Sequence, residues 1–467
     1  MAVRITQVKN LADPEAFAAQ LTALGIDLPW HDDPASELAS PVRITDGSAG
    51  ALTATNRIAV LPMEGWDGTT DGRPTDLVRR RWERFGAGGA GLVWGEATAV
   101  VPDGRANPNQ LVLTAETAAE FTGLRRLLSD EQVVGLQLTH SGRYARPTDR
   151  LPRTAYAHPA LDEPSGATEA SILSDDELDE LVATFVDAAV LVHEAGFDFV
   201  DVKACHGYLG HELLTAHDRP GRYGGDFTGR TRFMRSVIEG IRSRVPDLAI
   251  AARISIFDLA PFRPGEGGVG ETTADGSYRH AFGGDGTGVG IDLAEPSALF
   301  SLLEDLGVGL VSATAGSPYY VPHVQRPAYF PPSDGYRPPE DPLVGVARIL
   351  AATAELARRH PDLVIIGSGY SYLQQWLPQV GAGAISEGGA SMVGLGRMAL
   401  SYPDMAADIL AGRELEARLI CRTFSDCTTA PRAGLISGCF PLDPFYKEHE
   451  HRVELAAAKK AARSRLG

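Results

Sequence analysis

Short runs of apolar and β-branched residues recur eight times along the chain and alternate with segments of helical periodicity. Asp175 to Glu194 and Gly229 to Val245 show that periodicity most clearly, with apolar residues spaced for one helix face. Strands that alternate with helices pair in parallel, and eight of them close into a barrel. The pattern therefore predicts an α/β fold, a (β/α)8 TIM barrel, with strands at Arg57 to Met63, Gly91 to Thr98, Val133 to His140, Phe197 to Lys203, Leu248 to Ser255, Val308 to Ala315, Leu363 to Gly369 and Met392 to Met398. An open, doubly wound sheet is the alternative, but no Gly-x-Gly-x-x-Gly opens a helix after the first strand.

Three segments lie outside the predicted barrel, which we place at residues 51–412. Residues 1–50 form an N-terminal extension with a helix from Asp13 to Gly25 and a linker rich in Pro and Asp. Residues 257–296 carry ten glycines and follow the fifth strand, so we expect a long loop that acts as a mobile lid over the barrel mouth. Residues 413–467 form a tail that ends in a basic helix, Val453 to Arg465, which we expect to be a solvated or subunit-packing surface.

The composition of the chain excludes some kinds of binding partner. A formal net charge of −17 over 467 residues argues against nucleic acid and anionic membranes. No apolar run approaches the roughly 18 residues of a membrane span, and the N-terminus lacks the apolar core of a signal peptide. Four cysteines suit a reducing cytoplasm without a disulfide framework. The sequence thus predicts a cytoplasmic enzyme for a small-molecule substrate. It is compatible with a homo-oligomer but does not fix the oligomeric state.

The fourth predicted strand ends in a cluster of polar side chains. Lys203, His206 and Tyr208 follow the apolar run from Phe197 to Val202 within six residues. In a β/α barrel the catalytic groups lie at the carboxyl ends of the strands. A cation, an imidazole and a phenol at such an end indicate an active site.

This stretch resembles the old yellow enzyme family of FMN-dependent ene-reductases. The family carries His-x-x-His/Asn-Gly-Tyr at this point, followed by Tyr-Gly-Gly and Arg-Phe. Here His206 and Tyr208 match, the downstream motifs are present at 223–225 and 232–233, and Lys203 replaces the first histidine. The resemblance, over about residues 45–412, implies an NAD(P)H:flavin oxidoreductase that moves hydride between NAD(P)H, flavin N5 and a carbonyl-activated C=C bond, in reduction or the reverse desaturation. Tyr208 would donate the proton, and Lys203 with His206 would bind the carbonyl oxygen.

The resemblance also implies the FMN-binding residues. Pro62 and Met63 end the first strand, where the family's Pro-Met lies along the flavin, and Glu64 stands where some members have a cysteine. Ala97 would meet the ring edge through its backbone. Gln137, in Gln-Leu-x-His-x-Gly-Arg, would hydrogen-bond the pyrimidine, because a carboxamide offers both a donor and an acceptor.

Positive charge and glycine turns complete the implied cofactor site. Arg253 ends the fifth strand and would face flavin N1 and O2, although an ion pair with Asp201 or Asp258 is the alternative. Ser368 and Gly369 close the seventh strand, and Gly396 and Arg397 close the eighth. Loops after these two strands hold phosphate in many barrels, and the arginine adds a bidentate contact.

Lys203 leaves other interpretations open. A lysine at a barrel strand end could form a Schiff base in an aldolase, and a flavin-binding protein without turnover is a third class. Within the flavin interpretation, the ammonium would favour an anionic substrate oxygen, unless Lys203 loses its proton or pairs with Asp201 or another carboxylate.

Two further groups of residues bear on the site. Residues 318–323 and 144–146 are aromatic-rich stretches expected to line the substrate cavity. The tail holds only three cysteines, Cys421, Cys427 and Cys439, which is one short of a 4Fe–4S ligand set, so no metal is expected.

Overall fold

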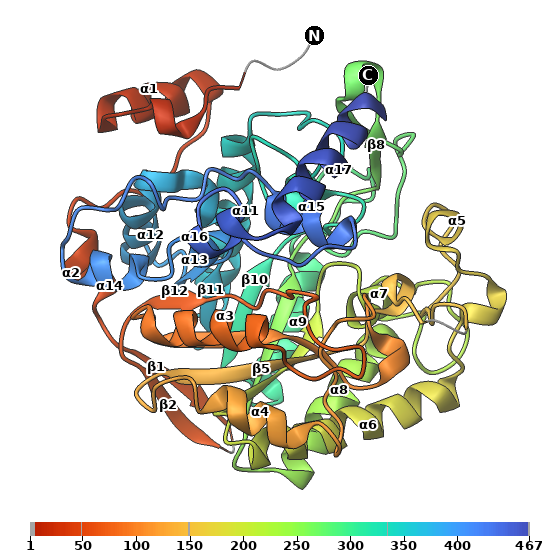
Figure 1. The fold of residues 1–467 in the computed structure, drawn as a ribbon. Coiled ribbons are helices and arrows are strands. Elements are labelled where there is room, and N and C mark those ends of the chain that lie inside the picture. The colour runs from red at the N-terminus through yellow and green to blue at the C-terminus, as the bar shows by residue number, and fades with distance from the viewer. Residues whose placement is uncertain (1–4, 48, 148–149, 334, 466–467) are drawn as a thin grey trace.

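The structure, a computed structural model, describes residues 5–47, 49–147, 150–333 and 335–465. Its centre is a closed barrel of parallel strands in the order β10-β11-β12-β3-β4-β5-β6-β7 (Figure 1). The strands are β3 (Ile58–Val60), β4 (Leu92–Ala99), β5 (Val133–Thr139), β6 (Phe199–Ala204), β7 (Ala249–Ser255), β10 (Leu310–Thr314), β11 (Val364–Gly367) and β12 (Met392–Leu395). Each lies within one of the eight predicted runs or extends it by one residue, and the predicted (β/α)8 barrel is confirmed.

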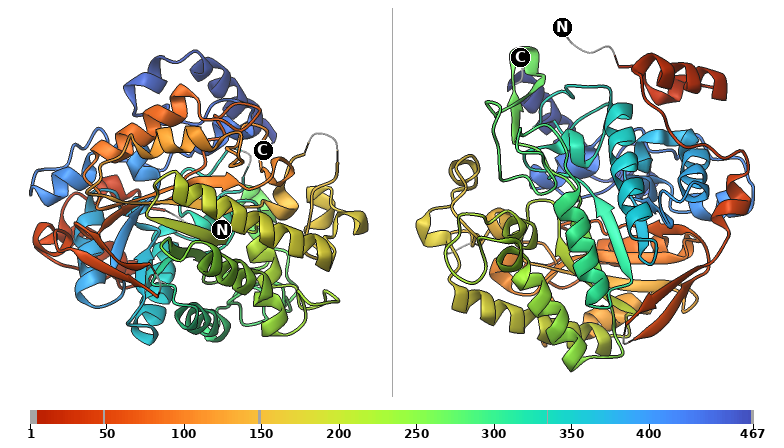
Figure 2. Two further views of the ribbon diagram at one scale, coloured as in Figure 1. Left: turned by 90° about the horizontal axis from the view of Figure 1, so that it is seen from below. Right: turned by 180° about the vertical axis from the view of Figure 1, so that it is seen from behind.

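Helices cover the outside of the barrel, as two further views show (Figure 2). The described helices are α1 (Pro14–Leu24), α2 (Pro34–Leu38), α3 (Asp76–Ala87), α4 (Ala118–Arg125), α5 (Asp162–Ser165), α6 (Asp175–Glu194), α7 (Leu209–Leu214), α8 (Phe227–Arg244), α9 (Ala294–Asp305), α10 (Pro322–Gln325), α11 (Pro342–Arg359), α12 (Leu377–Ser386), α13 (Arg397–Ser401), α14 (Met405–Leu410), α15 (Asp426–Arg432), α16 (Pro444–Glu448) and α17 (His451–Arg465). Helix α6 has the predicted bounds because Ser174 and Glu177 form a capping box at its start. Helix α8 starts two residues before the prediction, where the Asp226 carboxylate accepts from the Gly229 N–H.

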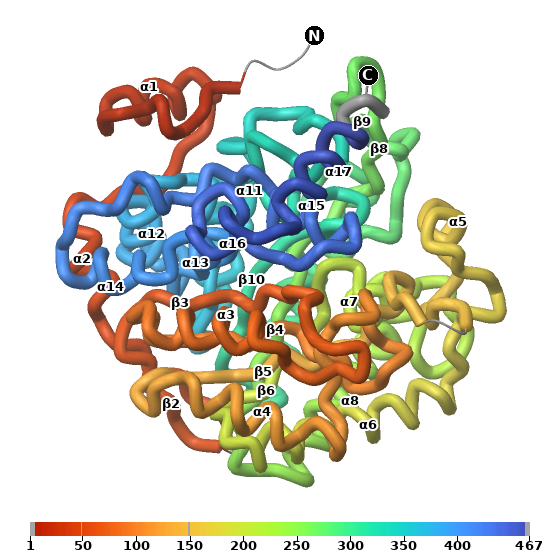
Figure 3. The backbone as a smooth tube through the Cα atoms, in the orientation of Figure 1, coloured from red at the N-terminus to blue at the C-terminus, as the bar shows by residue number. Residues whose placement is uncertain are grey.

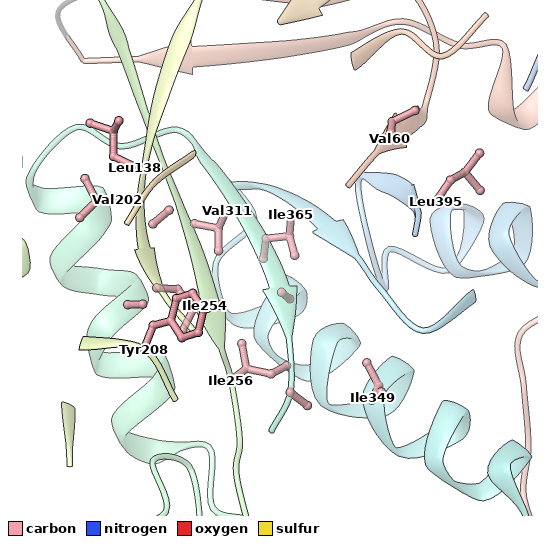
Figure 4. Close-up of a cluster of buried hydrophobic side chains, with 14 of the residues drawn as sticks. Val60, Leu138, Val202, Tyr208, Ile254, Ile256, Val311, Ile349, Ile365 and Leu395 are labelled. Carbon is pink, nitrogen blue, oxygen red and sulfur yellow. The ribbon is translucent and has the colours of Figure 1, made fainter. Parts of the chain in front are cut away.

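Successive side chains along each strand point to opposite sides of the barrel wall, so the barrel has two hydrophobic cores, one outside the wall and one inside. Side chains such as Val202, Ile254 and Val311 belong to the larger core outside the barrel axis, which also includes Ile349 of α11 (Figure 4). Their neighbours face the barrel axis, and at the amino end of the strands these are apolar: Ala59, Leu92, Trp94, Val133, Phe199, Ala249, Ala251, Leu310, Val364, Ile366 and Met392. Because the period of a strand is two residues, the next inward positions are Asp201, Lys203 and Arg253. The barrel axis therefore changes from apolar at its floor to charged at its mouth.

The N-terminal extension contributes more than the predicted helix. Helix α1 matches the prediction, with Asp13 as its N-cap and Gly25, at φ +66°, as its C-cap. A hairpin of β1 (Val42–Asp46) and β2 (Gly50–Ala54) follows it. Val42, Ile44 and Ala54 pack against the apolar barrel floor. The segment predicted as a linker therefore ends in a hairpin that closes the amino end of the barrel.

The glycine-rich insertion and the tail are both ordered by hydrogen bonds and packing. The insertion contains a hairpin of β8 (Phe262–Pro264) and β9 (Gly270–Thr272), and Phe282 is buried. The tail runs through α15 and α16 to α17, as the blue end of Figure 3 shows. Helix α17 starts two residues before the predicted basic helix. Among the described residues no helix has the length and apolarity needed to cross a bilayer.

Candidate functional site

A cavity opens at the carboxyl end of the barrel strands. It encloses about 1250 Å³ of space between atoms, including its open mouth. Eleven of the twelve predicted site residues line it: Pro62, Met63, Gln137, Lys203, His206, Tyr208, Arg253, Ser368, Gly369, Gly396 and Arg397. The twelfth, Ala97, lies in β4 beside Gln137 after a bulge at Gly95/Ala97. Its carbonyl accepts a hydrogen bond from Gln110 Nε2 at 3.0 Å, and it is not part of the lining.

Asp201 organises the inner layer of the cavity. One carboxylate oxygen accepts from Gln137 Nε2 and, at 2.9 Å, from Trp94 Nε1. The other accepts from the Arg253 backbone N–H at 2.9 Å. Burial raises the pKa of Asp201 to about 6, although the Gln137 hydrogen bond opposes this shift. Since a carboxylate only accepts, Gln137 is held with its amide nitrogen toward Asp201 and its oxygen is left for another donor.

The Arg253 guanidinium is buried and has an N–H donor without an acceptor. Its Nη1 donates to the Pro62 carbonyl at 3.1 Å, while Nε is buried without a hydrogen-bond partner. The alternative of an ion pair with Asp201 or Asp258 is not found among the contacts of the described residues: Asp201 accepts from the Arg253 backbone N–H, and Asp258 accepts from the Tyr320 hydroxyl. A buried donor without a partner is costly, and an acceptor of partial negative charge, such as the flavin pyrimidine, would satisfy it.

The other end of the cavity has the features of a phosphate cradle. Arg397 Nη2 donates to the Pro327 carbonyl at 2.7 Å, and Nη1 is buried without a hydrogen-bond partner. Gly369 has φ +96°, a conformation that favours glycine. A Cβ at Gly394 would lie 2.4 Å from the Gly367 carbonyl oxygen, so the turns after β11 and β12 can approach only as glycines. These turns and the unpaired N–H of Arg397 fit a phosphate group.

Lys203 forms an ion pair, which decides between the alternatives that the sequence left open for its charge. Its Nζ lies 2.8 Å from Glu64 Oε1, and its side chain is 3% exposed. The same Nζ lies 3.8 Å from the centroid of the Tyr208 ring. The expectation of a free positive charge facing the substrate is therefore not met. The alternative of pairing with a carboxylate holds, with Glu64 rather than Asp201 as the partner.

His206 is held in a strained backbone conformation. Its φ is +64°, which is uncommon for a residue with a side chain. The Ser255 hydroxyl accepts from its N–H at 3.0 Å, and the Ser317 hydroxyl donates to its carbonyl at 2.8 Å. Burial, followed by the nearby charges of Arg253 and Lys203, lowers the pKa of His206 well below its usual value. The imidazole is thus neutral at neutral pH, with Nε2 at 3.3 Å from Thr314 Oγ1.

Tyr208 lies among other hydroxyl and carboxylate groups. Its hydroxyl donates to Glu64 Oε2 at 3.0 Å and lies 3.1 Å from the Tyr319 hydroxyl. Burial and the Glu64 charge raise its pKa well above 10, so the phenol keeps its proton. Tyr319 lines the cavity, as predicted for residues 318–323. Tyr144 does not line it but stacks on the Tyr319 ring at 3.8 Å.

Several lining residues were not predicted. Glu64 was noted only because it replaces a cysteine, and Trp66, Gln325 and Arg326 gave no signal. The tail supplies Cys427, Thr428, Pro431, Arg432 and Ser437 to the wall. No residue of 257–296 lines the cavity, so the insertion is not placed where a lid was expected. His280 and Asp258 instead face a small cavity behind the Gly207 loop.

The four cysteines are free thiols. Burial raises the pKa of Cys421 and Cys427, which keeps them protonated. In the described part of the chain no group of three or more His, Cys, Asp or Glu residues is arranged to hold a metal ion.

Comparison with known proteins identifies relatives of this barrel. Residues 41–271 match the model of the NADH:flavin oxidoreductase / NADH oxidase family. An NADPH dehydrogenase of Clostridium acetobutylicum is 32% identical over 219 residues, which is 45% of this chain and 62% of that protein's length. An NADPH dehydrogenase of Bacillus subtilis is 27% identical over 288 residues, 61% of this chain and 74% of the relative.

A solved structure extends the likeness beyond the matched segment. The old yellow enzyme homologue from Zymomonas mobilis has a TM-score of 0.57 at 20% identity, over 81% of this chain and 93% of its own. At that identity the likeness concerns the fold. Together with the family match, these relatives agree with the predicted family, FMN cofactor and NAD(P)H donor. Residues 41–271 are thus similar to the NADH:flavin oxidoreductase / NADH oxidase family, and the barrel has the fold of an old yellow enzyme homologue.

Proposed function

We propose that the protein is an FMN-dependent oxidoreductase that uses NAD(P)H and acts on a carbonyl-activated C=C bond, in reduction or in the reverse desaturation. The observation that carries this proposal is the convergence of two sets of residues on one cavity. Arg253 and Arg397 both line the cavity, and each has a buried side-chain nitrogen without a hydrogen-bond partner. His206 and Tyr208 line the same cavity from the adjoining loop.

The chain's own residues would hold and orient FMN, which when bound supplies the hydride-carrying N5 atom. Gln137 would accept from a ring N–H through its oxygen, since Asp201 takes its amide nitrogen. Arg253 would donate to the pyrimidine side, and Arg397 with the turns at Gly369 and Gly396 would bind the phosphate. Pro62 and Met63 would pack along the ring.

His206 and Tyr208 would act on the substrate. A neutral imidazole can donate from Nε2 to a carbonyl oxygen, and this polarises the conjugated C=C bond. Lys203 can share that role only in part, because Glu64 already holds its ammonium at 2.8 Å. Tyr208 keeps its proton at neutral pH and would deliver it to the carbon next to the hydride-accepting one. The substrate class is therefore small α,β-unsaturated carbonyl compounds.

A Schiff-base mechanism at Lys203 is less well supported than it was from the sequence. Nucleophilic attack needs a neutral amine. Lys203 Nζ is instead paired with Glu64 and lies over the Tyr208 ring, so these groups already surround the nitrogen that would have to attack.

Anaerobic half-reactions would test the proposal. NADPH or NADH should bleach the bound flavin, and 2-cyclohexenone should restore its colour in the absence of oxygen. A flavin that NAD(P)H reduces but that no α,β-unsaturated carbonyl reoxidises would contradict ene reduction as the activity.

A further inference from the structure

The loop after β3 brings one carboxylate into contact with the proposed catalytic group. Glu64 Oε1 lies 2.8 Å from Lys203 Nζ. Glu64 Oε2 accepts from the Tyr208 hydroxyl at 3.0 Å and from Trp66 Nε1 at 2.9 Å. The side chain is 14% exposed. Among the lining residues in the described chain, it is the only carboxylate, beside Lys203 and four arginines.

A buried ion cluster fixes the position of this loop. The Gly65 N–H donates to Glu96 Oε2 at 3.2 Å. Arg81 pairs with Glu96 at 2.7 Å and with Asp67 at 2.6 Å. A Cβ at Gly65 would lie 2.3 Å from Asp67 Oδ1, so the loop passes this cluster at a glycine. Glu64 is therefore held at the cavity by its own loop as well as by Lys203.

Tyr208 is a poor proton donor if it acts alone. Burial and the Glu64 charge both raise the pKa of the phenol well above 10. Loss of its proton would leave a phenolate 3.0 Å from a carboxylate, and two adjacent anions in a desolvated site repel each other. Proton donation by Tyr208 therefore requires that Glu64 itself carries a proton that can move to the phenol oxygen as the first one leaves. Glu64 Oε2 lies 3.0 Å from that oxygen, within hydrogen-bond distance.

We propose that Glu64 exchanges protons with Tyr208, so that the tyrosine works as a relay between the substrate carbon and the Glu64 carboxyl group. This inference rests on the proposed function, under which the hydride is exchanged with FMN.

In reduction a C–H bond forms with the proton of Tyr208 Oη, the proton on Glu64 Oε2 moves to Oη, and Glu64 ends as a carboxylate. In desaturation the substrate proton moves to Oη, the original Oη proton moves to Oε2, and Glu64 ends as a carboxylic acid. Lys203 remains an ammonium throughout and stabilises the carboxylate. Glu64 acts through Tyr208 and is a positioning and proton-exchanging residue.

The solvent isotope effect on enone-driven flavin reoxidation tests the relay. Since two protons move in the relay, the wild-type rate in mixtures of H2O and D2O should depend on the square of the D2O fraction. Glu64→Gln cannot exchange a proton, so its rate should be roughly 10²-fold lower and should depend linearly on that fraction, as for one moving proton. Glu64→Asp keeps the exchangeable proton and should restore the two-proton dependence. The matched control is Glu340→Gln, which removes a half-buried carboxylate paired with Arg348 at 2.8 Å outside the cavity; it should match the wild type.

A binding measurement adds a readout that does not depend on turnover. The affinity of the oxidised, FMN-loaded protein for 4-hydroxybenzaldehyde would be followed by the change in the flavin absorption spectrum. Glu64→Gln leaves the Lys203 charge uncompensated, so the phenolate form should bind about 10-fold more tightly, the equivalent of one pKa unit. Glu340→Gln should leave the affinity unchanged.

The outcomes separate this inference from the function on which it rests. If the wild-type protein takes up no FMN, the proposed function fails and the inference fails with it. If it binds FMN and reduces enones but Glu64→Gln keeps both the two-proton dependence and the wild-type phenol affinity, only the relay is wrong. If Glu64→Gln does not fold, a one-proton dependence in both the wild type and Glu64→Asp would overturn the relay.

Discussion

Replacement of Arg81 by methionine would test how the Glu64 loop is held in place. Arg81 lies in α3 and is 7% exposed, and its partners Asp67 and Glu96 are 0% and 5% exposed. Burial raises the pKa of Glu96, against the opposing effect of Arg81. Arg81→Met would fill a similar volume but leave both carboxylates buried without a cation.

The expected cost follows from the burial of those two acids. Removing one partner of a buried ion pair typically costs about 3–5 kcal/mol, because the remaining charge is left uncompensated. With a urea m-value of about 3 kcal/mol/M, the first unfolding midpoint at pH 7.5 should fall by roughly 1 M. Without Arg81 the pKa of Glu96 rises further, so the uncompensated charge is lost once the pH falls below that value. The loss of stability should therefore be smaller at pH 5.5 than at pH 7.5.

Urea unfolding of FMN-loaded protein, followed by tryptophan fluorescence at both pH values, would measure these effects. Arg80→Met is the matched control on the same helix, because Arg80 is 28% exposed and its partner Asp443 also pairs with Arg84 at its other oxygen. It should cost no more than about 1 kcal/mol. Equal midpoints for Arg81→Met and Arg80→Met, or a larger loss at the lower pH, would refute the electrostatic account.

Three other substitutions have defined outcomes. Arg397→Ala should weaken FMN retention in ultrafiltration more than it alters the flavin spectrum, because its expected contact is the phosphate. Tyr208→Phe should slow enone-driven reoxidation by roughly 10²–10⁴-fold and leave flavin reduction by NAD(P)H nearly unchanged in stopped-flow traces; an equal loss in both would indicate a structural role. Burial raises the pKa of Asp258 to about 7, above the 3.8 of an unburied carboxyl, so its contribution to stability is complete below pH 3.8 and lost as the pH rises through about 7. Asp258→Asn should flatten the unfolding free energy between pH 5 and 8, and an unchanged slope would show that this carboxyl does not titrate there.

The barrel could be predicted because its strands are continuous apolar runs, a local signal. The strand period also places Gln137, Lys203 and Arg253 on one interior, and the structure has them there. The hairpin strands β1 and β2 were not predicted because their alternation of apolar and polar residues is short. Their apolar side chains become buried only through contact with the barrel floor, which the local sequence does not show. The part played by the tail depends on where α15 docks, which no local pattern encodes.

Glu64 marks the limit of sequence reasoning at the site. Its position after Pro62-Met63 was evident, but its partner lies 139 residues away at Lys203. A pairing over that distance is a property of the closed barrel, since β3 and β6 are not adjacent strands. The sequence therefore indicated the cationic residue correctly and left its charge balance undetermined.

Cofactor analysis of the purified protein tests most directly whether this cavity binds FMN. The protein should be yellow, and heat-released flavin should be FMN at one equivalent per chain, bound without a covalent link. A colourless protein that takes up no FMN on reconstitution would contradict the account.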